Sequence, residues 1–411
     1  MKPNAQIVFA LWFGMLVNFL DRVAMSFAGP SIMRELSMDP ASFGIVLSSF
    51  GVGYVLAQIP GGMLADRWGA RTMLVFGPLF WALFTGLTGL VSTLAGFVIV
   101  RICFGISESA AATSLPKLVG ATFVSKDRAR VMAICMCAIP LAPAFAGALV
   151  GKLVAAFGWQ TMFFLMAVPA LLASVFAWLL LPVRPAAAAE PDEPDAGQKR
   201  SLLSLMTRRR VWLLALFYFM HNIAYAGYLG WMPSYLALAH HIDLKALGPV
   251  ASIPYVFGFL GMLLFGWLGS ASFHRRRPQL IACCLVVAGA SLFLAYRADS
   301  VPLALAGLSG AAFCLFGTLG PLSAVSLDLA PARYRATLMG IWGTAAQLGG
   351  VVAPAVIGLL VSATGTFAGG FGFMIAALCV AAVGMLALVP LLAVAPAPMP
   401  QAVAAVPQEA G

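Results

Sequence analysis

Charged residues are scarce in this chain of 411 residues, since Asp, Glu, Lys and Arg make up only 9% of it. Soluble domains are roughly a quarter charged, because water must solvate their surfaces. So few charges cannot cover the surface of a water-soluble fold of this length. The scarcity of charge therefore excludes a water-soluble protein. Acidic residues are the scarcer kind, with 14 Asp and Glu against 24 Lys and Arg.

Residues typical of disulfides and enzyme sites are also missing from the segments where they would act. All seven cysteines lie inside long apolar stretches, and none lies in a segment where an oxidising compartment could pair it. No nucleophile, metal cluster or pair of carboxylates lies at a water interface, which a membrane enzyme would need. We therefore expect no enzyme activity, no metal site and no bound cofactor.

Long apolar blocks fill most of the chain, and 62% of its residues are hydrophobic. A helix that crosses a bilayer needs about 20 mostly apolar residues. Only helices and closed barrels satisfy their backbone hydrogen bonds in lipid. Alternating ten-residue strands are absent, so the blocks predict helices. We predict twelve spanning helices, near residues 6–29, 43–65, 72–92, 94–117, 128–151, 157–182, 211–238, 247–271, 278–297, 301–328, 336–362 and 367–393.

Lys and Arg are distributed unevenly over the connections between these blocks. With the N-terminus in the cytoplasm, 17 of the 24 lie in cytoplasmic segments and four in outer connections. This is the positive-inside rule. It predicts a multi-pass protein of the cell inner membrane with both termini in the cytoplasm. The net charge of +10 then reflects topology in the lipid bilayer, and we expect no nucleic-acid partner.

One break in composition divides the chain. Residues 183–210 (VRPAAAAEPDEPDAGQKRSLLSLMTRRR) combine Pro, Ala and charges of both signs and contain no spanning block. We predict a cytoplasmic linker there, between an N-terminal six-helix bundle (1–182) and a C-terminal six-helix bundle (211–393). Residues 394–411 are rich in Ala and Pro and predict a disordered cytoplasmic tail.

The two halves resemble each other at an offset of about 204 residues. Each match is weak alone, but three at nearly one offset, in equivalent places, predict a duplication. Parallel repeats of six helices build a large class of secondary transporters. The matching segments are Asn18-Phe19 with Asn222-Ile223, Gly62–Asp66 with Gly266–Ser270, and Arg128–Arg130 with Arg333–Arg335.

The connection between the second and third predicted helices reads GGMLADRWGAR. Its pattern, G-x-x-x-D-R-x-G-x-R, resembles the signature loop of the major facilitator superfamily. The resemblance implies two pseudo-symmetric bundles of six helices and a loop that gates the conformational change. In that role the Asp and Arg pair across the two halves on the cytoplasmic face and release on switching. The residues that match the pattern are Gly62, Asp66, Arg67, Gly69 and Arg71.

Four charged residues remain at membrane depth: Asp21, Arg22, Arg101 and Glu108. An ionisable group at the bilayer centre costs at least ~2.5–3.5 kcal/mol, so it faces a partner or a cavity. Arg101 and Glu108 are two helical turns apart on one face, and Asp21 lies at a depth similar to that of Arg101. A pair or triad is therefore reasonable. In the alternative interpretation, the four only pair with one another to hold two helices together.

The C-terminal half lacks charges at the equivalent positions. Arginine stays charged and binds carboxylates bidentately, whereas a desolvated acid can hold a proton near neutral pH. Two arginines with two acids favour a small anion carried with protons, against a C-terminal wall that offers Tyr225 and Trp231. The offset gives these equivalent pairs: Asp21 with Tyr225, Arg101 with Leu305, and Glu108 with Ala312.

Three segments, NFLDRVAMSFAGP, GYVLAQIPGG and RICFGISES, look like the anion:cation symporter family within that superfamily. The resemblance runs from about residue 14 to 180 and continues more faintly to about 365. It implies proton coupling by Asp21 and Glu108, binding of a substrate carboxylate by Arg22 and Arg101, and a hydrogen bond from Tyr54 in the cavity. Members of that family import sugar acids, dicarboxylates and aromatic acids.

The sequence departs from the family pattern in three places, which bear on the choice of substrate. Thr113 stands where the family has a proline, and Pro140 and Pro143 replace a glycine pattern in the fifth helix. Gly343 stands where the family has an asparagine. Gln347 lies near it in sequence and can supply an amide to the C-terminal wall of the cavity.

These features favour a monomeric, proton-coupled importer of a small organic anion that works by alternating access. The substrate classes are a sugar acid, a dicarboxylate or an aromatic carboxylate. The nearest alternative is a proton-antiport exporter of a drug or metabolite. Such exporters carry G-x₈-G-x₃-G-P in the fifth helix, and IPLAPAFAGAL does not fit that pattern. Na⁺ stays open as the coupling ion.

Overall fold

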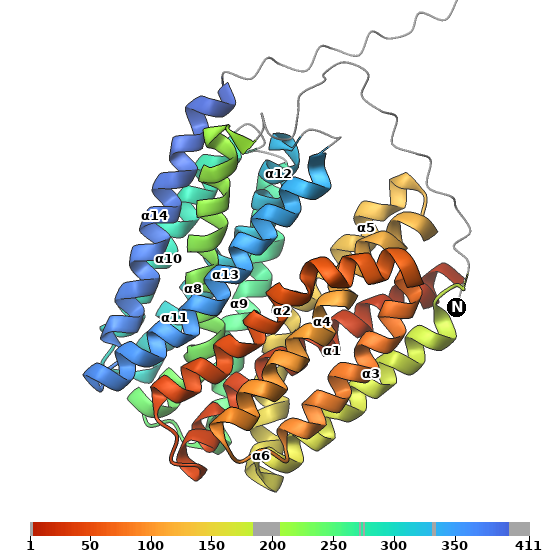
Figure 1. Cartoon of the computed structure of the whole chain (residues 1–411). Coiled ribbons are helices and arrows are strands. Elements are labelled where there is room, and N and C mark those ends of the chain that lie inside the picture. The colour runs from red at the N-terminus through yellow and green to blue at the C-terminus, as the bar shows by residue number, and fades with distance from the viewer. Residues whose placement is uncertain (1–2, 184–205, 271–272, 274–275, 331–333, 394–411) are drawn as a thin grey trace, which may run out of the picture.

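The protein is helical throughout its described part (Figure 1). Most of the predicted linker and the whole predicted tail lie outside this part. The computed structural model describes residues 3–183, 206–270, 273, 276–330 and 334–393.

The helices fall into two groups, one from each half of the sequence (Figure 1). The helices of the N-terminal half are α1 Pro3–Glu35, α2 Pro40–Trp68, α3 Ala70–Thr88, α4 Leu94–Thr122, α5 Ser125–Met136 and α6 Ala138–Leu180. Those of the C-terminal half are α8 Arg209–Ala239, α9 Leu244–Ser270, α10 Arg277–Tyr296, α11 Val301–Gly317, α12 Leu319–Leu329, α13 Arg335–Thr364 and α14 Ala368–Ala393.

These helices make up twelve spanning segments. Ten stretches of the described chain are long and apolar enough to cross a membrane. One of them, Arg130–Leu180, crosses twice, because the backbone leaves the helical region at Gly158 (φ 80°, ψ 164°) and the chain turns back there (Figure 1). The twelfth segment is α8, which is less apolar because it carries buried polar residues such as His221 and Ser234. The prediction of an all-α membrane protein with two six-helix bundles is confirmed.

Both halves repeat one tight helix crossing. A Cβ on Gly53 of α2 would overlap the carbonyl of Ile102 on α4, and a Cβ on Gly261 of α9 would overlap the carbonyl of Phe313 on α11. Only glycine lets two backbones approach so closely. The pair α2–α4 is therefore equivalent to the pair α9–α11, as a duplication requires.

This crossing corrects the predicted equivalent of Arg101. Because Ile102 corresponds to Phe313, Arg101 corresponds to Ala312 and not to Leu305. A constant offset of about 204 missed this because the offset is 208 between Gly53 and Gly261 and 211 between Ile102 and Phe313. By the same crossing, Glu108 corresponds to Leu319 and not to Ala312. Both candidates are apolar, so the charge asymmetry between the halves is unchanged.

The two halves are pressed together on the side opposite the linker, which we call the far side. A Cβ on Gly44 of α2 would lie 2.5 Å from the Pro354 carbonyl oxygen of α13. A Cβ on Gly151 of α6 would lie 2.8 Å from Cα of Gly248 on α9. Small residues at these points therefore let the bundles close against each other.

Polar groups add to this far-side contact. The amide of Ala355 on α13 donates to Ser48 Oγ on α2 over 3.0 Å. Asp39 caps the start of α2, and its carboxylate also accepts a hydrogen bond from Ser362 of α13 over 3.4 Å. Hydrogen bonding from Ser42 lowers the pKa of Asp39 and keeps this cap charged. The cap of one half thus contacts the other half.

On the linker side the halves separate. Figure 1 shows α2 and α13 close together at the far side and diverging towards the linker side. On this part of α2 the side chains of Ile59, Met63 and Trp68 are 74%, 67% and 57% exposed. The structure is therefore closed on the far side and open on the linker side.

The turn between α2 and α3 depends on one glycine. Gly69 has φ 87° and ψ 146°, a conformation that side chains with a Cβ rarely adopt. Its amide donates to the Ala65 carbonyl and ends α2, and α3 begins at the next residue. A single residue can reverse the chain here only because it is glycine.

Gly248→Leu should force the halves apart on the far side, because no space exists between α6 and α9. We expect the distance between spin labels at Phe157 and Leu303 to increase by on the order of 5 Å, since packed helices sit 8–10 Å apart according to their side chains. The measurement needs a background without the seven native cysteines. Gly372→Leu is the control, because a Cβ at Gly372 meets nothing within 4 Å. An unchanged distance in the Gly248 variant would contradict this account of the closed side.

Gly69→Ala should lower the free energy of unfolding by about 1–3 kcal/mol, the usual cost of holding a Cβ in such a conformation. Gly62→Ala is a matched control on the same helix, because a Cβ at either position meets nothing within 4 Å and Gly62 is helical. That control should be neutral or slightly stabilising. Thermal unfolding in detergent distinguishes the two, and equal midpoints would show that the turn is not strained.

Candidate functional site

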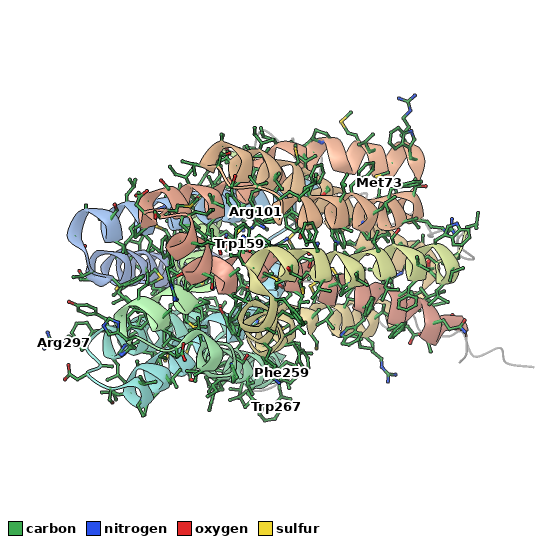
Figure 2. The ribbon with its side chains drawn as sticks, turned by 90° about the horizontal axis from the view of Figure 1, so that it is seen from below. Met73, Arg101, Trp159, Phe259, Trp267 and Arg297 are labelled. Carbon is green, nitrogen blue, oxygen red and sulfur yellow. The ribbon has the colours of Figure 1, made fainter. Side chains whose placement is uncertain are left out.

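The four charged residues predicted at membrane depth gather between α1 and α4. Asp21, Arg101 and Glu108 are 2%, 4% and 0% exposed. Arg22 and Glu108 form an ion pair, with 2.7 Å between the terminal guanidinium nitrogen and Oε2. Seen from below, Arg101 lies inside the body of the molecule, whereas Arg297 lies on its outline (Figure 2). The N-terminal half thus buries an ionic cluster, which is costly unless the charges are paired or face a cavity.

The pairing within the cluster differs from the expected one. Asp21 was expected to pair with Arg101; the two charges attract each other, but no ion pair joins them, and the Asp21 carboxylate accepts a hydrogen bond from Thr85 of α3 over 3.5 Å. Successive residues of a helix point about 100° apart. Asp21 therefore faces α3, while its neighbour Arg22 faces α4 and reaches Glu108.

Aromatic rings surround both guanidinium groups. The Arg22 guanidinium lies 4.8 Å from the ring centres of Phe19 and Phe50 and 5.4 Å from that of Tyr54. The Arg101 guanidinium lies 5.2 Å from the ring centre of Phe50. Sequence reasoning missed Phe50, although it precedes Tyr54 by four residues and so lies on the same helix face.

Arg101 has neither an ion pair nor a hydrogen bond among the described residues, in contrast to Arg22. Its guanidinium rests against the rings of Phe50 and Phe104, the latter 5.1 Å away. It also lines a cavity of about 100 Å³ between the two halves. The donors of a buried, permanently charged group are therefore free to receive an anion.

This central cavity brings together residues of both halves. Arg22, Phe50 and Arg101 line it from the N-terminal half. From the C-terminal half come Asn222, Tyr225 and Gln347, so that cations on one wall face amide and hydroxyl groups on the other. Of the predicted substrate residues, the structure brings four together here: Arg22, Arg101, Tyr225 and Gln347.

Asn222 was used in the sequence analysis only as a repeat marker. In the structure its amide donates to the carbonyl of Ala346, which fixes it beside the cavity. The sequence offered one sign that Asn222 belongs to the site. It matches Asn18, which lies beside Glu108 in the other half.

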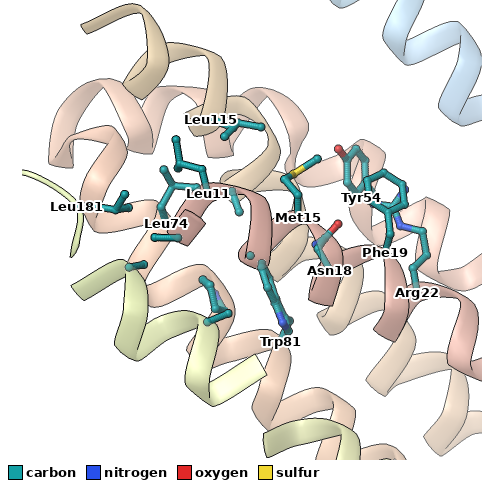
Figure 3. A pocket seen from close by; sticks show the side chains of 16 residues that line it. Leu11, Met15, Asn18, Phe19, Arg22, Tyr54, Leu74, Trp81, Leu115 and Leu181 are labelled. Atoms are coloured by element: carbon teal, nitrogen blue, oxygen red, sulfur yellow. The ribbon is translucent and has the colours of Figure 1, made fainter. Parts of the chain in front are cut away.

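Tyr54 lines a different cavity. This one has a volume of about 90 Å³, lies within the N-terminal bundle and shares Arg22 with the central cavity. Figure 3 shows Tyr54, Phe19 and Arg22 at one end of it and leucines such as Leu181 at the other. Tyr54 therefore lies behind Arg22, as seen from the central cavity, and supports that side chain.

Trp231 lies away from both cavities. Its indole N–H donates to the Pro354 carbonyl over 3.0 Å, and its ring packs edge-on against Phe43 of the other half. It is 2% exposed. The structure thus places Trp231 in the far-side contact between the halves, and we leave it out of the proposed substrate contacts.

The signature loop lies on the linker side, and its contacts stay within the N-terminal half. Asp66 pairs with Lys117 of α4 over 2.6 Å. Arg71 donates from Nε to the Leu181 carbonyl over 2.9 Å and so holds the end of α6. Arg67 is exposed. In this open arrangement no ion pair of the loop crosses to the described part of the other half, and pairing across the halves stays a prediction.

The C-terminal half has its own ion pair on the linker side. Arg277 at the start of α10 contacts Asp328 of α12 over 2.7 Å and also donates to the Gly269 carbonyl.

The described residues contain no cluster of three or more His, Cys, Asp or Glu that could hold a metal ion. The chemistry available at the site is therefore that of arginines, carboxylates and hydrogen-bonding groups.

Several related proteins match over most of this chain. It is 27% identical to a hexuronate transporter of Bacillus subtilis, covering 90% of this chain and 91% of that protein. It is 31% identical to a probable L-galactonate transporter of Escherichia coli, covering 87% and 83%. It is 26% identical to a quinolone resistance transporter of Acinetobacter baumannii, covering 87% of each.

The fold also matches a solved structure. A bacterial homologue of the human lysosomal transporter Spinster, crystallised in an inward-facing and unoccupied conformation, aligns with a TM-score of 0.78. The alignment covers 96% of this chain and 95% of that one at 18% identity, so it speaks for the fold alone. The sequence profile of the Major Facilitator Superfamily matches residues 11–354. The chain therefore belongs to the Major Facilitator Superfamily and is a multi-pass membrane transporter, not an enzyme.

Proposed function

We propose that this transporter imports a small organic anion, a sugar acid foremost, together with protons. The observation that carries the proposal is Arg101, a buried cation that lines the cavity between the two halves and has no ion pair with an acid among the described residues. A permanent charge at that depth is stabilised best when an anion completes its coordination. The hexuronate and L-galactonate transporters among the relatives support a carboxylate of this class.

The proposed anion site has two walls of different chemistry. Arg101 and Arg22 receive the carboxylate through charge-assisted hydrogen bonds. Tyr225, Asn222 and Gln347 face them with groups that suit the hydroxyls of a sugar acid. A substrate that bridges the walls draws the halves together, which is the motion that alternating access needs.

Competition for Arg22 provides the coupling step. Glu108 holds Arg22 at 2.7 Å, and an anion that binds Arg22 displaces it. The displaced carboxylate is fully buried, and a buried charge without a partner is unfavourable, so it takes up a proton. One anion and one proton then leave the total charge of the cluster unchanged. In a low-dielectric site this neutrality favours binding both ligands or neither.

The orientation follows from the distribution of Lys and Arg. In a bacterial inner membrane with both termini in the cytoplasm, the open linker side faces the cytoplasm. The structure then corresponds to a state that releases substrate into the cell. The loop residues Gly62, Asp66, Arg67, Gly69 and Arg71 then lie at the cytoplasmic opening. We propose that closing this opening exchanges the Asp66–Lys117 pair for contacts between the halves. We propose a monomer, because each chain contains both walls of its cavity.

Export in exchange for protons is the second candidate, and the quinolone resistance transporter among the relatives favours it. Both functions use Arg101 and Glu108, but they predict opposite responses to a pH gradient. Uptake of glucuronate, L-galactonate and other radiolabelled acids into proteoliposomes decides between them. Import predicts accumulation when the outside is acidic, whereas antiport predicts expulsion under that gradient. Replacing Na⁺ by K⁺ in the same assay tests sodium as the coupling ion.

Arg101→Ala should weaken binding of the transported acid at least about 30-fold, because losing one partner of a buried charged contact costs 2 kcal/mol or more. Arg101→Lys should recover little, since a point charge does not reproduce the planar fork. Calorimetry in detergent measures both, with Arg297→Ala at an exposed far-side position as the control. Normal affinity in Arg101→Ala would remove Arg101 from the site.

Glu108→Gln should keep substrate exchange and lose accumulation driven by pH, because the amide mimics the protonated acid but cannot release a proton. Asp21→Asn should behave similarly if Asp21 also carries a proton. Exchange and pH-driven uptake are compared in the same vesicles, with Asp299→Asn at an exposed position as the control. If Glu108→Gln still concentrates the acid against its gradient, Glu108 is not the coupling group.

A further inference from the structure

The contacts that hold Arg101 are unusual for a buried cation. The residue is 4% exposed, yet it has neither an ion pair nor a hydrogen bond in the described part of the chain. The charged groups around it are Asp21 and Arg22 of α1 and Glu108 of its own helix. Glu108 is engaged by Arg22, and that second arginine repels the first. Asp21 and Glu108 attract Arg101, but neither forms an ion pair or hydrogen bond with it among the described residues, so the groups in direct contact with the cation decide how it is held when no substrate is bound.

Phe50 is the group that contacts both arginines. Its ring centre lies 4.8 Å from the guanidinium carbon of Arg22 and 5.2 Å from that of Arg101. Both distances are within the roughly 6 Å over which a ring attracts a cation. Phe104 also contacts Arg101, but only Phe50 touches the two cations together among the described residues.

The fold fixes the position of Phe50. A Cβ on Gly105 of α4 would overlap the Phe50 carbonyl, so α2 and α4 are in backbone contact at this residue. The ring packs against those of Tyr54 and Phe104 at 5.8 Å and 5.6 Å between centres, and it is 8% exposed. Phe50 therefore has little freedom to move away from the arginines.

We propose that Phe50 is the positioning residue of the anion site, whose ring stabilises Arg101 in place of an acidic partner and sets its spacing from Arg22. The inference rests on the proposed anion site and adds how that site stays charged when empty. A carboxylate partner would occupy the N–H donors of Arg101. An aromatic ring attracts the cation through its π face and accepts none of those hydrogen bonds in the guanidinium plane. The donors are then left for the substrate.

The test changes the electronics of the ring but hardly its shape. Fluorination of phenylalanine withdraws charge from the π face and weakens cation binding, so 3,4,5-trifluorophenylalanine is incorporated at position 50. Thermal unfolding of the purified, substrate-free transporter in detergent is then measured. We expect the midpoint to fall by about 2 °C, from the usual strength of such contacts and the size of the chain. The same substitution in an Arg101→Met background should cause a clearly smaller fall.

Phe97 is the matched control, because it lies on α4 with Arg101, is 0% exposed, and packs on Trp159 rather than on a cation. Trifluorination at Phe97 should leave the midpoint unchanged. An equal effect at Phe50 and Phe97, or an equal fall with and without Arg101, would overturn the proposal. If Arg101→Met does not fold, the comparison of Phe50 with Phe97 in the parent chain still decides. No substrate is used, so failure of the proposed import would show only in the vesicle assays.

Discussion

The ion pair between half-buried Arg22 and Glu108 is the interaction on which the site depends. It joins α1 to α4 at 2.7 Å inside the N-terminal bundle, and Glu108 is fully buried. Breaking a buried pair by removing one partner strongly destabilises a protein, since a lone charge is left in a poorly solvated place. In the proposed mechanism, a substrate anion can exchange with Glu108 only if a proton arrives with it. The cost of unpaired charge thus links two binding events without any direct contact between the ligands.

The duplicated fold places this chemistry on one side only. The crossing at Gly53 recurs at Gly261, so the halves share their packing, yet the equivalent of Arg101 is Ala312. The C-terminal wall offers neutral groups, Tyr225 and Gln347 among them. A neutral wall can close over the ionic cluster, whether Glu108 or a substrate anion pairs with Arg22. Closing it removes no further charged side chain from water. The halves therefore share their packing, while the charged residues at membrane depth lie in the N-terminal bundle.

Sequence reasoning predicted the fold well because lipid imposes strong constraints. Spanning length is a property of local segments, and it placed all twelve segments near their observed positions. The same reasoning found the four buried charges, since any charge at that depth is conspicuous. It could not find their pairing, which depends on the rotation of α1 that turns Asp21 to α3 and Arg22 to α4. Phe50 was missed for a different reason: it is one phenylalanine among 29 in an apolar sequence, and its spacing of four residues from Tyr54 gains meaning only once that face is known to lie against Arg22.

The positions of the two acids imply unequal roles. Glu108 touches an arginine that lines the central cavity, so in the proposed mechanism its charge state responds directly to an arriving anion. Asp21 contacts Thr85 of α3 and lines neither that cavity nor the cavity beside Tyr54. A proton on Asp21 would therefore act through the packing of α1 on α3 rather than through competition for an arginine. The tilt of α1 moves Arg22, because the two residues are adjacent. Asp21 would then set how readily Arg22 leaves Glu108, and Glu108 would carry the proton exchanged for that contact.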